Sequence, residues 1–246
     1  MRVALFLGCA ASDLVPRVGA LWTKISRILY DDAVVFGSGN CCGMPFFLSG
    51  KMGVAKRRGE EIIRRLRDFD VIITGCPSCY RMFSEFYPGQ LGLEVGCEVL
   101  HVVQALWRGL KEGRIRPRNS VNIRVTYHDP CELSRHAGLM EEPRKILEVV
   151  PGLEFVETEL NGKLSTCCGG GGLMRVLFPK ISQEIAIRKL IDEIVPLGVS
   201  AVVTACPFCE YVLEDALRST GNEHSIRIMD ISEIILMSLG AGDESE

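Results

Sequence analysis

The sequence predicts an α/β protein built as a tandem, pseudo-twofold repeat of two small halves, each a parallel sheet with helices. Two observations predict this fold. The same cysteine motifs recur in the same order in both halves of the 246-residue chain, and short β-branched runs alternate with amphipathic stretches. Ligand-binding residues in such sheets follow the carboxyl ends of the strands, so we expect the cysteines to lie there.

The repeat is defined by its cysteines. Each half contains a single cysteine, a spacer, Cys-Cys-Gly, a second spacer and Cys-Pro-x-Cys, and both spacers are four residues longer in the second half. The polar, basic stretch 111–122 is the natural boundary, so we expect domains at residues 1–112 and 113–246. The motif cysteines are Cys9, Cys41, Cys42, Cys76 and Cys79 in the first half, and Cys131, Cys167, Cys168, Cys206 and Cys209 in the second.

Apolar runs that directly precede cysteines predict buried parallel strands, and the amphipathic stretches between them predict helices. The predicted strands are residues 3–7, 71–74, 123–127 and 201–204, and the predicted helices are about 15–29, 54–68, 179–194 and 208–218. Glycines mark places where the backbone bends close to a ligand. The glycine run 169–172 lacks the Lys-Ser/Thr ending of a phosphate-binding loop, which disfavours nucleotide binding.

Composition narrows the class of protein. A hydrophobic content of 47% suits a globular core, and a net charge of -3 provides no basic surface for nucleic acid. The basic stretch 56–67 is interpreted as a solvated helix face, with a docking patch for an acidic redox partner as the alternative. No apolar run is long enough to span a membrane, so we expect a cytoplasmic protein that reaches a membrane only through a partner subunit. The acidic residues 242–246 are expected to be a disordered tail.

Eleven cysteines without a secretory signal indicate reduced thiols that bind metal or perform redox chemistry. A tetrahedral zinc ion takes four ligands, and so does a cubane iron–sulfur cluster with one thiolate per iron. Each half offers five thiols, including an adjacent pair that cannot easily form a disulfide. The number of thiols alone does not decide between four interpretations. These are zinc sites, structural disulfides, cubane clusters with a spare thiol, and an unusual five-thiolate cluster.

The pattern of Cys, Cys-Cys-Gly and Cys-Pro-x-Cys, present twice, resembles the cysteine-rich CCG domain family. This family includes the B and D subunits of heterodisulfide reductase and related subunits of lactate, glycolate and glycerol-3-phosphate oxidation and of sulfite reduction. The resemblance spans nearly the whole chain. The second-half segments 127–131, 141–144, 167–172 and 204–209 look most like the D-type. The D-type also has a ferredoxin-like domain with two cubane-binding cysteine runs. These 246 residues contain no such run, so we expect the domain content of the B-type.

The resemblance implies an iron–sulfur subunit of an oxidoreductase complex. Each set of five cysteines would hold a noncubane [4Fe-4S] cluster, and the two clusters would cleave or form a disulfide, with one electron from each side. The implied partners are subunits that carry cubane clusters or flavin, together with a small disulfide or thiol substrate. The alternative function is an electron-transfer subunit of a dehydrogenase that passes electrons to a quinone or membrane partner. A zinc or scaffold protein without redox chemistry is the third class.

Two histidines near the second motif are candidate catalytic residues. His128 precedes Cys131 and His136 follows it, so each is placed to contact a cluster sulfur or to donate a proton to a product thiolate. A structural role is the alternative for both. We expect His101 to be structural and to lie on a helix, and Cys97 to be a spare thiol outside both motifs.

Overall fold

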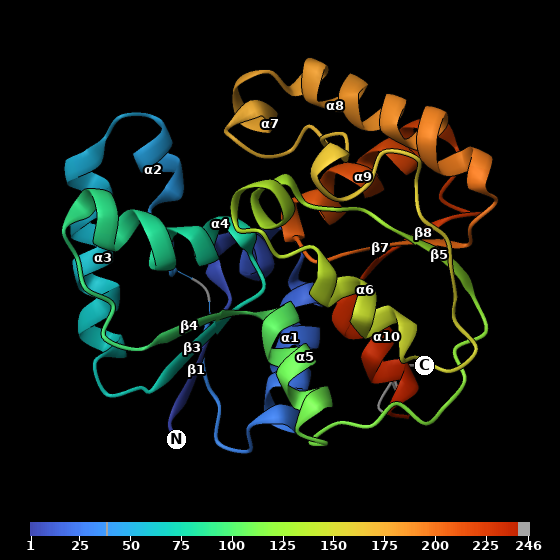
Figure 1. The fold of residues 1–246 in the computed structure, drawn as a ribbon. Coiled ribbons are helices and arrows are strands. Elements are labelled where there is room, and N and C mark those ends of the chain that lie inside the picture. The colour runs from blue at the N-terminus through green and yellow to red at the C-terminus, as the bar shows by residue number, and fades with distance from the viewer. Residues whose placement is uncertain (38, 241–246) are drawn as a thin grey trace. The chain divides into compact units, whose positions relative to one another are not determined.

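The structure is a computed structural model that describes residues 1–37 and 39–240 (Figure 1). The chain divides into two compact units, Met1–Ala105 and Leu106–Glu246, and each contains a four-stranded parallel sheet. The predicted α/β class and tandem repeat are therefore confirmed. The division falls inside helix α5 (Val102–Lys111), and the domain boundaries 1–112 and 113–246 remain a prediction. The acidic tail lies outside the described residues.

The first unit is built on a sheet of order β2-β1-β3-β4. Its strands are β1 (Val3–Phe6), β2 (Val34–Phe36), β3 (Val71–Thr74) and β4 (Glu98–His101). All residues of β1 and β3 are buried, because each of these strands has a neighbour on both sides. This explains their continuous apolar sequences.

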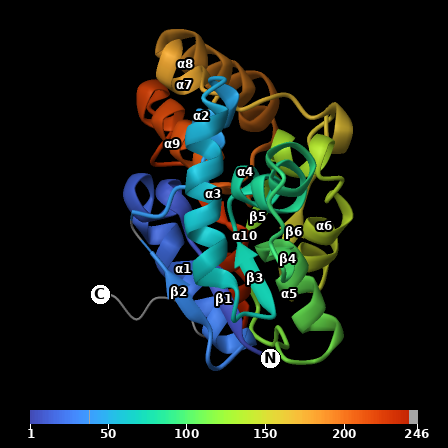
Figure 2. The same ribbon diagram turned by 90° about the vertical axis from the view of Figure 1, so that its left-hand side faces the viewer.

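Helices cover both faces of the first sheet. The longer ones are α1 (Pro16–Leu29) and α3 (Met52–Leu66), and the shorter ones are η1 (Ala10–Leu14), α2 (Met44–Leu48), α4 (Pro77–Arg81) and η2 (Met82–Leu91). Figure 2 shows α3 in front of this sheet, and the two views together place α1 and the start of α5 on its other face. Each long helix turns one buried stripe toward the sheet, as its amphipathic sequence predicts.

The second unit repeats the arrangement with a sheet of order β6-β5-β7-β8. Its strands are β5 (Arg124–Tyr127), β6 (Glu154–Phe155), β7 (Ala201–Thr204) and β8 (Arg227–Asp230). Its helices are η3 (Glu132–His136), α6 (Glu141–Glu148), η4 (Gly162–Leu164), α7 (Met174–Leu177), α8 (Pro179–Arg188), η5 (Lys189–Ile194), η6 (Val195–Leu197), α9 (Pro207–Thr220) and α10 (Ile231–Ser238). In Figure 1, α8 and α9 lie side by side over one face of this sheet, with α6 and α10 on the other.

The core between the second sheet and its helices α8 and α9 extends up to the motif cysteines. Residues of α8, α9, β7 and β8 form one buried cluster that also includes Cys168, Cys206 and Cys209. These three sulfurs therefore sit at the end of a dry core and not in a mobile surface loop.

All four predicted strands and all four predicted helices are present, but the four edge strands β2, β4, β6 and β8 were missed. Strands β2 and β6 are only three and two residues long and partly exposed, so they lack a periodic signal. The expected position of His101 was wrong by one residue. It is the last residue of β4, paired with Thr74, and the helix begins at Val102.

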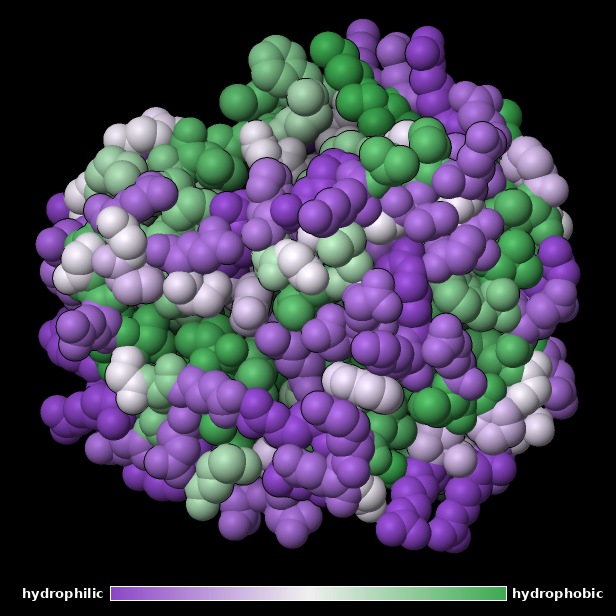
Figure 3. Space-filling model, in the orientation of Figure 1, coloured by the Kyte–Doolittle hydropathy of each residue, from purple (hydrophilic) through white to green (hydrophobic). Residues whose placement is uncertain are grey.

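No helix within residues 1–37 and 39–240 is both long enough and apolar enough to cross a bilayer. An exposed apolar cluster is seen as green side chains near the top of Figure 3, where α7 and the start of α8 lie in Figure 1. It consists of the exposed residues Val176, Leu177, Phe178 and Ile181. Clusters of this kind often mark binding surfaces.

A glycine before the Cys-Pro-x-Cys motif of the first unit is required by packing. The Trp22 side chain is fully buried, and a Cβ atom at Gly75 would fall inside its indole ring. The second unit has Ala205 at the corresponding position, one residue before Cys206. Gly75 thus reflects the large side chain of α1 rather than a conformation that only glycine adopts.

A buried ion pair anchors the segment that leads into Cys131. The carboxylate of Asp129 accepts hydrogen bonds from Arg144 at 2.8 and 3.0 Å and from the Gly162 backbone N–H at 2.8 Å. Arg144 also donates to Glu157 at 2.6 Å. Since the Asp129 side chain is almost fully buried, these bonds tie the end of β5 to α6 and to the loop before Cys167.

We expect Gly75→Ala to lower the free energy of unfolding by about 1–3 kcal/mol, because overpacking of a rigid indole cannot be relieved cheaply. Chemical denaturation measures the loss. Gly53→Ala is the matched control, since a Cβ there meets only the far end of the Arg57 side chain and alanine favours a helix. Equal effects of the two substitutions would contradict this account.

We expect Arg144→Met to cost about 3–5 kcal/mol of unfolding free energy, because it leaves the buried Asp129 carboxylate without its charged partner. Arg114→Met is the control, since the Arg114–Glu112 pair is largely solvent-exposed and such pairs contribute at most about 1 kcal/mol. Denaturation midpoints of both variants test the difference. A loss no larger than that of the control would show that the pair does not anchor this segment.

Candidate cysteine metal sites

The two Cys-Pro-x-Cys motifs bend from a strand directly into a helix. Cys76 follows β3 and is the N-cap of α4, while Cys206 follows β7 and is the N-cap of α9. Proline occupies the first helical position in both, where its fixed φ suits the helix and its missing N–H costs no hydrogen bond. The fourth residue of each motif, Cys79 or Cys209, then lies on the first helical turn and returns its sulfur to the strand end.

The glycine of each Cys-Cys-Gly motif is required by the backbone. Gly43 and Gly169 have φ values of +89° and +82°, a region that favours glycine. Space is also short at both, because a Cβ would lie 3.3 Å from the Ala55 backbone at Gly43 and 2.6 Å from the Ser182 carbonyl oxygen at Gly169. Each glycine thereby allows the loop that carries the two cysteines to pass close to α3 or α8.

The structure brings together all five motif thiols of the first unit. Hydrogen-bonding contacts join them in a chain that runs from Cys9 to Cys41, Cys42, Cys79 and Cys76. Cys42, Cys76 and Cys79 are buried, whereas Cys9 and Cys41 are half-buried. The five sulfurs come from segments that are far apart in sequence.

The second unit gathers its five thiols in the same way. Contacts join Cys131 to Cys167, Cys167 to Cys168, and Cys206 to Cys209, and the sulfurs of Cys168 and Cys209 are 3.2 Å apart. Cys131 and Cys167 are half-buried and the other three are buried, which matches the first unit position by position. All eleven cysteines of the chain are free thiols.

One thiolate in each site is stabilised by its neighbours. Hydrogen bonds from Cys42 and Cys9, and then from the Gly43 backbone N–H, lower the pKa of Cys41 to about 2. In the second site, hydrogen bonds from Cys131 and Cys168, with that of the Gly169 N–H, lower the pKa of Cys167 to about 2. The Gly–sulfur distances are 3.4 and 3.3 Å.

The crowding that stabilises one thiolate raises the pKa of several of its neighbours. Hydrogen bonding to the Cys41 thiolate, with burial and the charge of its neighbours, raises the pKa of Cys9. Hydrogen bonding to Cys42 and Cys76, with burial, likewise raises the pKa of Cys79. Five sulfurs packed this closely resist ionising together unless a cation balances them.

Basic side chains fix the residue before each cysteine pair. Arg65 donates to the Asn40 side chain at 2.5 Å in the first unit. In the second unit, the buried Lys189 donates to Thr166 at 2.9 Å and to Glu193 at 3.0 Å. These contacts were missed from the sequence, because nothing in the spacing of the helical residues relates them to the motifs.

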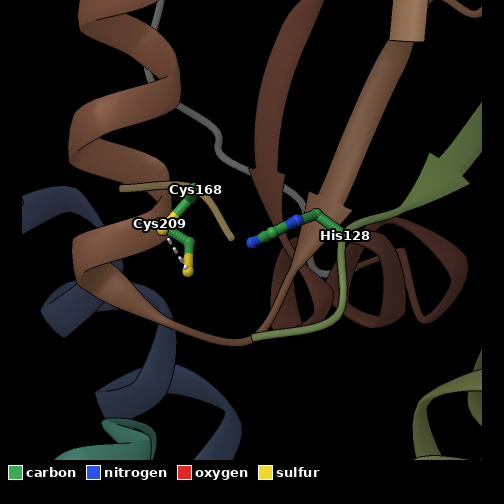
Figure 4. Close-up of side chains that lie close together, drawn as sticks. All are labelled: His128, Cys168 and Cys209. Carbon is green, nitrogen blue, oxygen red and sulfur yellow. Dashed lines mark hydrogen bonds between the residues drawn. The ribbon is translucent and has the colours of Figure 1, made fainter. Parts of the chain in front are cut away.

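The two candidate catalytic histidines have different surroundings. His128 is 2% exposed, and one of its ring nitrogens lies within 4.8 Å of the sulfurs of both Cys168 and Cys209. Figure 4 shows its ring directed from the end of β5 toward these two side chains. His136 is instead half exposed, with Nε2 4.0 Å from Glu132. The structure thus brings His128 to the thiols and leaves His136 at the surface.

The other two residues discussed from the sequence, His101 and Cys97, are not part of the thiol clusters. The imidazole of His101 is buried, and its Nε2 is 2.9 Å from the Gly75 carbonyl oxygen, which ties β4 to the residue before Cys76. Burial lowers the pKa of His101 to about 3, so it is neutral. Cys97 is half-buried in the loop that leads into β4.

Comparison with known proteins identifies the repeated unit. The model of the cysteine-rich domain family matches residues 3–84 and 125–214. The chain is 35% identical to the B subunit of fumarate reductase (CoM/CoB) of Methanothermobacter marburgensis, over 96% of the chain and 46% of that protein. It is 33% identical to an uncharacterized iron–sulfur protein of Methanocaldococcus jannaschii, with the same two coverages.

A third relative is the D subunit of the dihydromethanophenazine:CoB–CoM heterodisulfide reductase of Methanosarcina acetivorans, at 28% identity over 99% of the chain and 60% of that protein. The chain spans about half the length of the curated relatives it matches. The two matched segments contain all ten clustered cysteines. The chain belongs to the cysteine-rich domain family and carries two copies of that domain.

Proposed function

We propose that each five-cysteine site holds an iron–sulfur cluster and that the chain is the subunit of an oxidoreductase complex that cleaves or forms a disulfide. The observation that carries this proposal is the convergence of five thiols at the same sheet edge in both units. Relatives named as an iron–sulfur protein and as part of a heterodisulfide reductase support it.

The donor set fits a cluster better than a single metal ion. Zinc takes four ligands in a tetrahedron, and each unit offers five sulfurs. A noncubane [4Fe-4S] cluster with five thiolates would use all of them. The ligands would be Cys9, Cys41, Cys42, Cys76 and Cys79 in the first unit, and Cys131, Cys167, Cys168, Cys206 and Cys209 in the second.

Two bound clusters would supply single electrons, and two of them match the two electrons that a disulfide requires. The protein controls access. In both units the half-buried cysteines are the single cysteine and the first of the adjacent pair, Cys9 with Cys41 and Cys131 with Cys167. A small disulfide or thiol would therefore reach each site from this side. In the second unit, Cys168, Cys206 and Cys209 are part of the buried hydrophobic core on the opposite side.

Proton delivery to a product thiolate is assigned to His128 and His136 as candidates. His136 lies on η3, the turn that directly follows Cys131, and its exposure lets it exchange protons with solvent. His128 lies against Cys168 and Cys209. Both roles are proposals that rest on position.

Other subunits, with cubane clusters or flavin, would supply or accept the electrons. The exposed apolar cluster on α7 and α8 supports association with such a partner. We place the complex in the cytoplasm, with any contact to a membrane made through that partner. The alternative function is electron transfer to a quinone without substrate chemistry. The response of the bound clusters to added thiols separates it from disulfide chemistry.

We expect Cys42→Ser and Cys168→Ser each to halve the iron and acid-labile sulfide content of anaerobically prepared protein, because each removes a ligand from one site only. The double substitution should abolish both. Cys97→Ser is the control and should keep full content, since Cys97 lies outside both sites. Colourless, iron-free wild-type protein would refute the proposal, and full zinc occupancy would replace it with a structural zinc protein.

We expect an added thiol to change the electron paramagnetic resonance spectrum of the oxidised protein, because a substrate-accessible site binds product. Glu132→Gln, a substitution beside Cys131 that keeps all ten motif cysteines, should leave the iron content unchanged and serves as the matched background. If the protein has its full iron content and its spectrum does not change when thiols or disulfides are added, the electron-transfer alternative is favoured.

A further inference from the structure

The two sites differ at one position that the strand register makes equivalent. Leu5 pairs with Ile73 in the first sheet, and Tyr127 pairs with Val203 in the second. Ile73 and Val203 each lie three residues before the first cysteine of a Cys-Pro-x-Cys motif. The residues that follow Leu5 and Tyr127 are therefore structural counterparts, and they are Phe6 and His128.

Both counterparts are buried beside the sulfur of the last motif cysteine. Phe6 is 1% exposed, and a Cβ built at Gly8 would lie 3.5 Å from its Cε1 and 3.0 Å from the Cys79 sulfur. Its ring packs edge-on against Phe83 at 5.0 Å. In the second unit, the corresponding space beside Cys209 is occupied by the imidazole of His128.

The two ring nitrogens of His128 are buried and have no hydrogen-bond partner among the described residues. Only its backbone is bonded, with its N–H donating to the Val203 carbonyl at 2.8 Å and its carbonyl accepting from Thr204 Oγ1 at 3.1 Å. Leaving a buried polar group unpaired costs free energy. A buried imidazole without a protein partner is therefore expected where a bound group supplies the missing partner.

The neighbouring charged groups do not satisfy this imidazole. The carboxylate of Asp129 is occupied by Arg144 and by the Gly162 N–H, and Lys189 is bonded to Thr166 and Glu193. The other charged groups that act on His128 are Arg135 and the Cys167 thiolate. Arg135 donates to the Ser165 carbonyl, and the Cys167 thiolate accepts hydrogen bonds from Cys131 and Cys168. The imidazole instead faces the sulfurs of Cys168 and Cys209 (Figure 4).

We infer that His128 contacts the group bound at the second site through a ring nitrogen, and that this contact makes the second site the higher-potential member of the pair. The inference rests on the proposed function. A hydrogen bond to a cluster sulfur, or a neutral nitrogen ligand that takes the place of a thiolate on iron, stabilises the more negative, reduced state. The phenyl ring of Phe6 can neither donate a hydrogen bond to a sulfur of the first site nor bind iron. Electrons would therefore rest at the second site, and His128 acts there as a positioning and tuning residue.

The main test compares the two midpoint potentials of the full chain, loaded with iron and sulfide, in wild-type protein and in His128→Phe. In His128→Phe we expect the midpoint potential of the second site to fall by at least about 59 mV, which is a tenfold change in a one-electron equilibrium. The potential of the first site should not change. Phe6→His, the reciprocal change, should raise the potential of the first site. His136→Phe is the matched control and should move neither.

A spectroscopic test needs no substitution. With 15N-labelled histidine, pulsed electron paramagnetic resonance should detect a nitrogen coupling at one centre, which is lost in His128→Phe and kept in His136→Phe. A strong coupling assigns an iron ligand and a weak one assigns a hydrogen bond, and both support the inference. His128→Leu repeats the comparison with a smaller side chain if the phenylalanine disturbs folding.

Two iron-loaded sites whose potentials are unmoved in His128→Phe and His128→Leu would overturn the inference, as would a nitrogen coupling that survives these substitutions or is absent from wild-type protein. The proposed function would stand in each of these cases. If the wild-type protein binds no iron, the proposed function is refuted, and so is this inference, which depends on it.

Discussion

The structure depends on one constraint, the pairing of two fully buried parallel strands that end at the same sheet edge. In the first unit β1 and β3 run side by side in register, and in the second β5 and β7 do the same. Parallel strands present their carboxyl ends at one edge. The single cysteine after one strand and the Cys-Pro-x-Cys motif after the next are therefore neighbours in space, although they are more than sixty residues apart in sequence.

The adjacent cysteine pair of each site is positioned differently from the cysteines that follow the strands. It is carried on a loop and not on a strand, so its position depends on the left-handed glycine that follows and on the close contact with α3 or α8. Backbone N–H groups of Gly43 and Gly169 point at the first sulfur of the pair. The same glycine thus turns the chain and supplies a donor to the negative charge that a thiolate site accumulates.

Duplication of a domain does not make its two sites equal. The units share the sheet order, the cysteine positions and the pattern of half-buried and buried thiols. They differ in the side chains that surround the sulfurs. The first unit has Phe6 and the Asn40–Arg65 contact, while the second has His128 and the buried Lys189 network. Under the proposed function, clusters bound in these different polar environments would differ in potential, because solvation and hydrogen bonding set the potential of an iron–sulfur cluster.

The sequence by itself determined the fold class, the repeat, the central strands and the ten cysteines. Each of these leaves a local pattern, namely a continuous apolar run, a helical period or a motif repeated in order. Only the tertiary structure decided how the sulfurs group, that His128 and not His136 faces them, and that Gly75 makes room for Trp22. These features depend on pairs of residues brought together by strand register and helix packing, and a chain read in one dimension has no signal for such contacts.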